Sequence, residues 1–408
     1  MQPLVLVGVS GFEPEASWTR TKRDTKLRHT PLPGYYNEKT TFCQPRMFLH
    51  DIHETISFFL FPIVKRAVKW YTKKKYLLIW GGFAMCTAVT YQGRHHYFGR
   101  NLDLEYSYEE KVTITPRNYP LHFRKLETIP THYAMIGMAT VSEDSPLYYE
   151  ATNEKGLSMA GLNFPGLAVY FPEKKDSDNV TPFEFIPWIL SQCSNIEDAL
   201  VLLQRINLVD IPFSPQYPLS PLHWIIADCQ RSITVESTQQ GLSVMDNPVG
   251  ILTNNPPFEF HLYNLRNHIN VSPQPPTARF ANSFEIKPFS NGMGGIGLPG
   301  DFSSASRFIK AAFVKLNSIP FHSEEECVSH FFHILNSVAM PYGSVLISPN
   351  KYEITRYSSC CNTSLGIYYY TTYANSRITA VDMHREDLDN NRLICHNLQA
   401  DADFFFQN

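Results

Sequence analysis

A cysteine directly follows a methionine at Met85-Cys86, and no other feature of the sequence constrains the fold as strongly. Removal of the methionine makes Cys86 the first residue, which then carries a thiol and a free α-amine. The amine has a reference pKa of about 7.7–8.0, so near neutral pH it can accept the thiol proton. One residue thus supplies both a nucleophile and its base. The sequence predicts that a catalytic domain begins at Cys86.

The first 84 residues differ in charge from the rest of the chain. They hold 13 Lys+Arg and 6 Asp+Glu, a balance of +7, whereas the remainder holds 35 − 13 = 22 basic and 38 − 6 = 32 acidic residues, a balance of −10. We predict that residues 1–85 are a non-native, poorly ordered N-terminal extension or a propeptide that is removed. Residues 86–408 are then a single catalytic domain.

A lipoprotein signal is a different interpretation of the same region. Lys73 to Lys75 precede the apolar stretch YLLIWGGFA, and Cys86 follows shortly afterwards. The apolar stretch is short, and Met85 fits poorly at a cleavage site that requires small residues. In this alternative the protein is non-catalytic and is anchored through a lipid on Cys86.

The composition is that of a globular protein and excludes several classes. The chain of 408 residues is 43% hydrophobic with a net charge of −3, which gives no indication of a nucleic-acid partner. It contains no run of eighteen apolar residues, so no stable membrane insertion is expected. The eight cysteines form no CxxC pair and no zinc spacing, which favours reduced thiols, a cytoplasmic location, no metal and no cofactor.

Local patterns predict strands and helices in clusters. Short β-prone runs on either side of Gln92-Gly93 predict a hairpin. Apolar spacing predicts helices over 183–193 and 196–206, with Pro187 interrupting the first, and an amphipathic helix over 304–316. Ser323 opens a capping box for a helix that runs to Val338. Further strands are expected at 112–116, 133–141, 157–162, 232–237, 366–373 and 377–383. Such clustering is typical of an α+β fold, with antiparallel sheets packed against helices in layers.

Five segments resemble one family in the order of that family. They are the run that begins MCTAVTYQGRHHYFGRNLDLE at Met85, TNEKGLSMAGLNFPG (152–166), GILTNNPPF (250–258), GLPGDFSSASRF (297–308) and GIYYYTTY (366–373). Together they resemble the choloylglycine hydrolases, that is, bile salt hydrolases and penicillin V acylases, within the N-terminal-nucleophile hydrolase superfamily. The resemblance implies a four-layer αββα sandwich with Cys86 at the head of a central strand.

The resemblance also implies roles for particular residues. Cys86 would be the nucleophile, Asp103 would hold its α-amine, and Arg100 would favour the thiolate. Asn163 and Asn254 would stabilise the oxyanion, and Arg307 would lie beside the nucleophile. Without the resemblance, Arg100 and Asp103 read as a surface ion pair, the two asparagines as turn residues and Arg307 as a cation on a helix surface.

The implied substrates are glycine- and taurine-conjugated bile salts. Residues at matched positions that would contact a rigid apolar steroid are Leu102, Phe213, Tyr217 and Leu222, although all four read equally well as core. Penicillin V acylase or another N-acyl amidase is the alternative, and Asn163 argues against it because penicillin V acylases typically carry tyrosine there. The segment Ser290-Asn291-Gly292 lies where members of the family vary with conjugate preference, and its Ser-x-Gly form favours glycine over taurine conjugates. The resemblance suggests a homotetramer.

Overall fold

The hairpin expected around Gln92-Gly93 is present, and it forms the centre of one sheet. The computed structural model describes residues 85–408, all within one compact unit that spans Trp70–Asn408. Strand β1 (Met85–Gln92) pairs antiparallel with β2 (His96–Leu104), with Met85 opposite Asp103 and Cys86 opposite Leu102. The predictions for residues 1–84, including the propeptide and lipoprotein interpretations, lie outside the described residues.

The first sheet has seven antiparallel strands. Its order is β12-β1-β2-β14-β15-β16, with β13 also paired to β14. The remaining members are β12 (Ile251–Leu252), β13 (Val345–Ser348), β14 (Lys351–Asn362), β15 (Ile367–Thr372) and β16 (Thr379–Asp382). Because β14 lies directly beside β2, residues from late in the chain lie next to its first described strands.

The second sheet has eight antiparallel strands in the order β11-β10-β9-β6-β5-β4-β3-β17. They are β3 (Lys111–Thr115), β4 (Met135–Ser142), β5 (Ser145–Asn153), β6 (Ser158–Asn163), β9 (Leu222–Ala227), β10 (Ser232–Thr238), β11 (Gly241–Asp246) and β17 (Ile394–Asn397). A parallel pair, β7 (Asp178–Val180) and β8 (Ile206–Leu208), lies outside both sheets.

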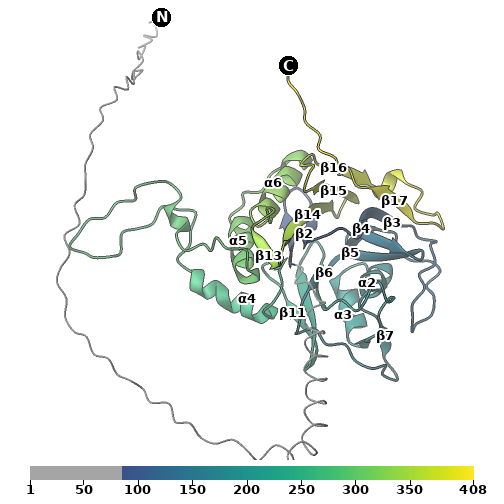
Figure 1. Ribbon diagram of the computed structural model, residues 1–408. Coiled ribbons are helices and arrows are strands. Elements are labelled where there is room, and N and C mark those ends of the chain that lie inside the picture. Colours follow the sequence, from purple (N-terminus) through teal and green to yellow (C-terminus); the bar gives the residue numbers. More distant parts are fainter. Residues whose placement is uncertain (1–84) are drawn as a thin grey trace, which may run out of the picture. The chain divides into compact units, whose positions relative to one another are not determined.

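The two sheets pack against each other, and a helical layer covers each outer face (Figure 1). Helices α5 (Ser304–Leu316) and α6 (Glu324–Asn336) pack on the first sheet. Helices α2 (Phe185–Gln192) and α3 (Ile196–Leu203) lie over the second, where α2 packs on β5 and β6. One hydrophobic cluster joins the facing sheets with α5 and α6, and another joins the second sheet with α2 and α3. This is the predicted α+β, four-layer αββα sandwich.

Most expected elements are present, with three corrections among the helices. The helix expected over 196–206 ends at Leu203, and Ile206 begins strand β8. The helix predicted over 304–316 has those bounds, and Ser323 forms the expected capping box with Glu326. Pro187 does not interrupt α2: it is the third residue of that helix, within the first turn, where its missing N–H has no intrahelical partner to lose. The helix expected to reach Val338 ends at Asn336.

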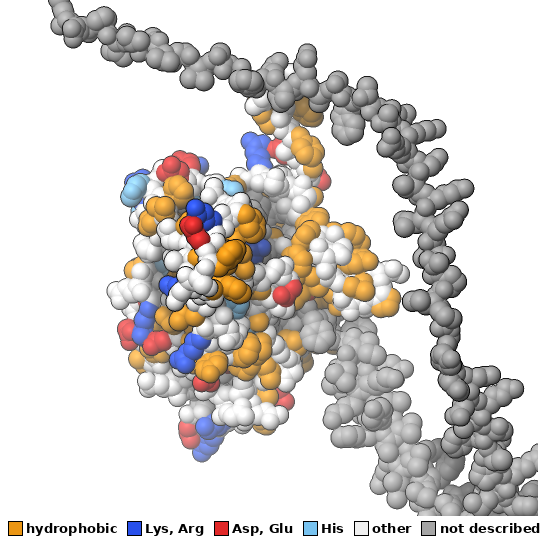
Figure 2. Space-filling view, turned by 90° about the vertical axis from the view of Figure 1, so that its left-hand side faces the viewer, with side chains coloured by type: hydrophobic (Ala, Val, Ile, Leu, Met, Phe, Trp, Pro, Cys, Tyr) orange, Lys and Arg blue, Asp and Glu red, His pale blue; other side chains and the backbone are white. Residues whose placement is uncertain are grey.

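A long segment between β12 and α5 extends away from both sheets (Figure 1). It starts with α4 (Phe258–Asn264) and η1 (Leu265–His268) and contains η2 (Met293–Gly295). We call residues 258–300 the arm. Within it, residues 273–292 are all exposed. Hydrophobic side chains gather on the molecular face that carries the arm (Figure 2), and the exposed ones of the arm are Phe260, Tyr263, Ile269, Phe280, Phe284, Ile286, Phe289 and Ile296.

Two further findings concern membranes and thiols. No helix within residues 85–408 has both the length and the apolar character needed to cross a bilayer. The seven cysteines of this range, which include the adjacent Cys360 and Cys361, are all unpaired. One short helix, η3 (Met383–Arg385), follows β16.

Candidate active site

Cys86 is the second residue of β1 and is only 2% exposed. Its backbone nitrogen donates a 2.9 Å hydrogen bond to Oδ1 of Asn254. Burial raises the pKa of the Cys86 thiol, whereas the positive charge of Arg100 acts in the opposite direction. The thiol therefore needs a nearby base to become a nucleophile while it stays in this environment.

Arg307 links strand β1, which carries Cys86, to the loop that carries Asn254 by hydrogen bonds. Its guanidinium donates to the carbonyl oxygen of Cys86 at 2.5 Å, to Oγ1 of Thr87 at 2.6 Å and to Oδ1 of Asn254 at 2.7 Å. Arg307 can reach all three because it lies in the first turn of α5, and Ser304 at the start of that helix accepts the backbone N–H of Asn254 at 2.8 Å. Arg307 is 1% exposed, so the structure rules out a solvent-facing helix cation.

Asp103 is fully buried beside the start of β1. Its Oδ1 accepts a 2.6 Å hydrogen bond from Oγ1 of Thr355, while its Oδ2 has no hydrogen-bond partner among the described residues. Burial raises the pKa of Asp103 to about 6, against the opposing effects of Arg307, Thr355 and Arg100. Since a buried carboxylate oxygen is costly to leave unpaired, Oδ2 is suited to a donor that this structure does not contain.

Arg100 reaches from β2 across to the second sheet. Its Nη1 donates to the carbonyl oxygens of Gly161 at 2.6 Å and Tyr149 at 3.1 Å, and its Nε lies 3.8 Å from a carboxylate oxygen of Glu150. Both charged side chains of that pair are buried. A guanidinium fixed on so many sides has little freedom to move. Arg100 thus presents a positive charge near Cys86 at a fixed position.

Asn163 ends β6 at the opposite wall of the site. Its carbonyl oxygen accepts a 2.7 Å hydrogen bond from Nδ2 of Asn254, and the residue is 9% exposed. The two asparagines predicted to act together are therefore adjacent, although 91 residues separate them in sequence. One N–H of the Asn254 amide is used in this contact, and the amide nitrogen carries a second.

A cavity of about 300 Å³ opens beside Cys86. Its walls include Cys86, Arg100 and Asn163 together with all four residues predicted to contact an apolar ligand: Leu102, Phe213, Tyr217 and Leu222. The rings of Phe213 and Tyr217 meet edge to face at a centroid distance of 6.1 Å. An apolar wall with a few convergent polar groups is the usual character of a small-molecule site.

Several residues of this cavity were not anticipated from the sequence. They include Phe183, which precedes α2, and Ile186 in the first turn of that helix. Ile347 of β13 and Glu353 of β14 also line the cavity. Phe183 and Ile186 fall within the helix predicted over 183–193, but that pattern did not indicate that they line a cavity. No local motif surrounds Glu353, which reaches the site only because β14 pairs with β2.

One segment with an expected role in substrate preference lies outside the cavity. Ser290-Asn291-Gly292, expected to bear on conjugate preference, belongs to the exposed arm, and none of the three is among the described residues that line the cavity.

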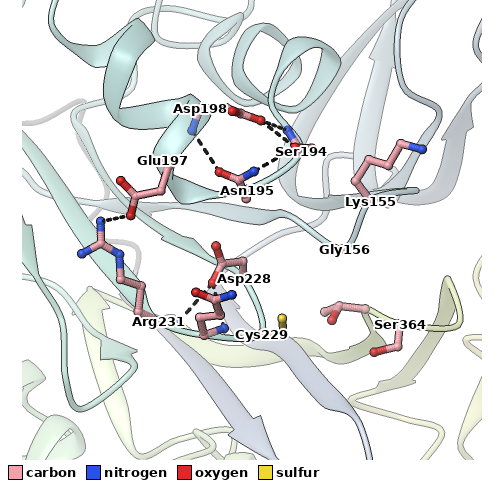
Figure 3. Close-up of a pocket in the computed structure, with 12 residues that line it drawn as sticks. Lys155, Gly156, Ser194, Asn195, Glu197, Asp198, Asp228, Cys229, Arg231 and Ser364 are labelled. Atoms are coloured by element: carbon pink, nitrogen blue, oxygen red, sulfur yellow. Dashed lines mark hydrogen bonds and ion pairs between the residues drawn. The ribbon is translucent and has the colours of Figure 1, made fainter.

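A second cavity, of about 380 Å³, lies near the start of α3 and contains none of the predicted site residues (Figure 3). Its charged groups are already partnered: Asp198 accepts from Ser194, Arg231 pairs with Glu197 at 2.8 Å, and Asp228 accepts from the backbone. In residues 85–408, no group of three His, Cys, Asp or Glu side chains is arranged to hold a metal ion.

Comparison with known proteins gives one consistent family. Residues 86–396 match the family model described as linear amide C-N hydrolases, choloylglycine hydrolase family. The chain is 52% identical over 324 residues to a bile salt hydrolase/transferase of Lactiplantibacillus plantarum, which covers 79% of this chain and all of that protein. It is 39% identical over 315 residues to a bile salt hydrolase/transferase of Clostridium perfringens, which covers 76% of this chain and 95% of that protein.

Solved structures agree with these sequence matches. A crystal structure of a mutant conjugated bile acid hydrolase from Clostridium perfringens superposes with a TM-score of 0.73 at 36% identity, covering 79% of this chain and all of that one. A penicillin V acylase from Agrobacterium tumefaciens superposes with a TM-score of 0.61 over 78% of this chain and 94% of that one. Because the sequence identity to the penicillin V acylase is only 18%, this superposition supports the fold alone.

Proposed function

The chain belongs to the choloylglycine hydrolase family, a family of linear amide C–N hydrolases, and we propose that it hydrolyses glycine- and taurine-conjugated bile salts with Cys86 as an N-terminal nucleophile. The observation that carries this proposal is the position of Cys86: its thiol borders an apolar cavity while its backbone nitrogen is held by Asn254. The relatives at 52% and 39% identity are both bile salt hydrolase/transferases.

The first step in the mechanism is the loss of Met85, which turns the backbone nitrogen of Cys86 into an α-amine. The amine accepts the thiol proton, and the thiolate attacks the carbonyl carbon of the substrate amide. The C–N bond then breaks, the amine returns the proton to the departing nitrogen, and glycine or taurine leaves. Water, activated by the same amine, attacks the thioester and releases the bile acid with the thiol restored.

Asp103 is proposed to hold that amine. Within residues 85–408 its Oδ2 has no hydrogen-bond partner, and Met85 is directly opposite Asp103 in the β1–β2 ladder. A free amine has donors that a peptide nitrogen lacks, so it can reach Asp103 as well as Asn254. Arg100 supplies positive charge that favours the thiolate.

Asn254 and Asn163 are proposed to stabilise the tetrahedral oxyanion together with a backbone N–H. A fixed amide donor near the developing negative charge lowers the barrier because it needs no reorganisation during the reaction. Arg307 supports this arrangement, since its hydrogen bonds hold both the Cys86 carbonyl and the Asn254 amide. Leu102, Phe213, Tyr217 and Leu222 would contact the steroid.

Two alternatives predict different observations. A penicillin V acylase would share the fold and the nucleophile, but Asn163 stands where such enzymes typically carry tyrosine. A lipoprotein anchored at Cys86 would need the sulfur to be accessible to lipid, whereas Cys86 is 2% exposed within a sheet. The burial of this thiol favours the enzyme.

A homo-oligomer, and specifically the homotetramer suggested by the family resemblance, is proposed as the assembled form. Its support is the arm, where large apolar side chains such as Phe280 and Phe289 are 88% and 87% exposed. Apolar clusters of this kind mark protein interfaces. Light scattering after size-exclusion chromatography is expected to give four copies, and the triple variant F280D/F284D/F289D a smaller assembly. A monomeric wild-type protein would contradict this proposal.

The cytoplasm is the proposed location, on the grounds that the seven described cysteines are unpaired, including the adjacent Cys360 and Cys361. Cell fractionation of the native host tests it. Recovery of the enzyme from the extracellular medium would be the contrary result.

The central experiment uses protein expressed from Met85. Intact mass is expected to show a free Cys86 N-terminus, and the assay compares glycocholate, taurocholate and penicillin V. Faster release of glycine or taurine than of the penicillin side chain is the expected result. Preference for penicillin V would instead select the alternative acylase. Mass analysis of the protein from the native host would show whether residues 1–85 are retained in the mature protein.

A further inference from the structure

Glu353 is a buried acid at the active site to which the mechanism above gives no role. It is 1% exposed and lines the same cavity as Cys86. It lies on β14 two residues before Thr355, the residue that holds Asp103. Strand β14 pairs with β2, and β2 pairs with β1, so Glu353 lies near the start of β1.

The partner of Glu353 is a backbone amide one residue upstream of the nucleophile. Its Oε1 accepts a hydrogen bond from the N–H of Met85. The mechanism requires Met85 to leave, and this amide leaves with it. The carboxyl group then stays in a buried position without its donor, which is unfavourable unless another donor replaces it.

The charge of Glu353 also acts on the nucleophile. Glu353 and Cys86 line the same cavity, and a negative charge on Glu353 raises the pKa of Cys86. A ligand that fills this cavity beside Cys86 therefore also meets Glu353. In the proposed reaction that ligand contains the scissile amide, a secondary amide that carries one N–H.

We propose that Glu353 accepts a hydrogen bond from the N–H of the scissile amide, in the place that the Met85 N–H occupies in the unprocessed chain. Glu353 is then a specificity-determining residue that favours secondary amides over amides whose nitrogen carries no hydrogen. This inference rests on the proposed amidase function and adds a recognition contact to it.

The protonation state of Glu353 suits this contact. Its neighbours are Cys86 of β1, Asp103 and Glu105 of the β2 segment, and Arg307 of α5. In the chain that retains Met85, burial raises the pKa of Glu353 to about 8, against the opposing effect of the Met85 N–H. A neutral carboxyl can accept an N–H through its carbonyl oxygen without repelling the anionic end of a glycine or taurine conjugate.

The test measures kcat/KM for glycocholate and for the matched sarcosine conjugate of cholate, whose amide nitrogen carries a methyl group. Each variant is described by the ratio of the two values, which cancels general effects on activity. E353Q keeps an acceptor oxygen and should keep the wild-type ratio. E353L removes the acceptor and should lower the ratio about tenfold, the equivalent of one hydrogen bond. Glu127→Gln, an exposed exchange of the same kind, is the matched control.

The outcomes separate the inference from the proposed function. A ratio in E353L equal to that of the wild-type enzyme would overturn the role of Glu353 while leaving the amidase intact, and so would a wild-type enzyme that cleaves both substrates equally. A wild-type enzyme with a free Cys86 that does not cleave glycocholate would instead overturn the proposed function. If circular dichroism shows that E353L does not fold, the same ratio is measured for E353A.

Discussion

The backbone nitrogen of Cys86 donates a 2.9 Å hydrogen bond to Oδ1 of Asn254. The atom that becomes the α-amine is thus already positioned by the amide group proposed to stabilise the oxyanion. Arg307 donates to the same Oδ1 at 2.7 Å, which fixes the orientation of the amide and aims its nitrogen away from the guanidinium. The proposed nucleophile, base and oxyanion donor therefore belong to one hydrogen-bonded unit.

Replacement of the nucleophile should abolish turnover without unfolding the protein. Cys86→Ala removes one buried sulfur, and we expect glycocholate hydrolysis to fall at least about 10³-fold, as for loss of other catalytic nucleophiles. The melting temperature should change little, because alanine fits the strand. Cys395→Ala, at an exposed cysteine on β17, is the control. Retained activity in Cys86→Ala would end the proposed mechanism.

Loss of the Asn254 amide should act on the chemical step. We expect Asn254→Ala to lower kcat about 10²–10³-fold, the usual effect of removing one oxyanion donor. KM should change far less, since the apolar cavity wall is untouched. Steady-state kinetics on glycocholate separate the two parameters, with Asn267→Ala on the exposed η1 as control. A rise in KM alone would assign Asn254 to binding.

Exchange of the buried arginine should destabilise the fold. A lysine at position 307 cannot donate hydrogen bonds to Cys86, Thr87 and Asn254 at the same time, so buried acceptors are left unpaired. We expect Arg307→Lys to lose about 2–4 kcal/mol in the free energy of unfolding, measured by urea denaturation. Lys310→Arg on the same helix should lose much less. Equal stability of the two variants would show that the hydrogen bonds of Arg307 contribute little.

Truncation of the cavity wall should weaken substrate binding. Phe213 is 7% exposed and contacts the ring of Tyr217. We expect Phe213→Ala to raise KM for glycocholate roughly tenfold, since the apolar contact is worth about 1–3 kcal/mol. In Leu365→Ala, which truncates a 41% exposed side chain, KM should stay at the wild-type value. A KM unchanged in Phe213→Ala would mean that the steroid binds elsewhere.

Burial of Glu353 should make the stability of the unprocessed chain depend on pH. Its pKa rises from 4.5 to about 8 on folding, so the folded state holds the proton more tightly. The stabilisation is present below pH 4.5 and is lost as the pH rises through about 8. The free energy of unfolding of Glu353→Gln should therefore exceed that of wild type by on the order of 2 kcal/mol at pH 9 and should equal it at pH 4.

Denaturant titrations at the two pH values, on chain that retains Met85, make this measurement. The exposed Glu127→Gln variant should show no such pH dependence. A Glu353→Gln variant that follows the wild-type pH profile would mean that Glu353 is ionised in the fold.

Local sequence was sufficient for elements whose residues are neighbours in the chain. The hairpin at Gln92-Gly93 and the helix over 304–316 follow from turn residues and from apolar spacing. Strand β14 was not predicted at all, although its twelve residues make it the longest strand described. Its partner β2 lies some 250 residues earlier, and pairing at that distance depends on the whole fold rather than on a local pattern.

The same limit applies to the site. Arg307, Asn254 and Asp103 were assigned through resemblance, because their own neighbourhoods suggest a helix cation, a turn and a surface ion pair. Glu353 belongs to no motif, and its contact with Met85 spans 268 residues. Only the packing of β14 beside β2 brings it to the nucleophile.

The pairing of Met85 with Asp103 has a practical consequence for producing the enzyme. Under the proposed mechanism, any residue kept in front of Cys86 prevents its nitrogen from becoming a free amine, so an affinity tag fused there would keep the enzyme inactive. The last residues of the chain are exposed and follow the final strand, β17. Purification handles therefore belong at the C-terminus, and a cleavable N-terminal fusion offers a preparation that stays inactive until a protease exposes the cysteine.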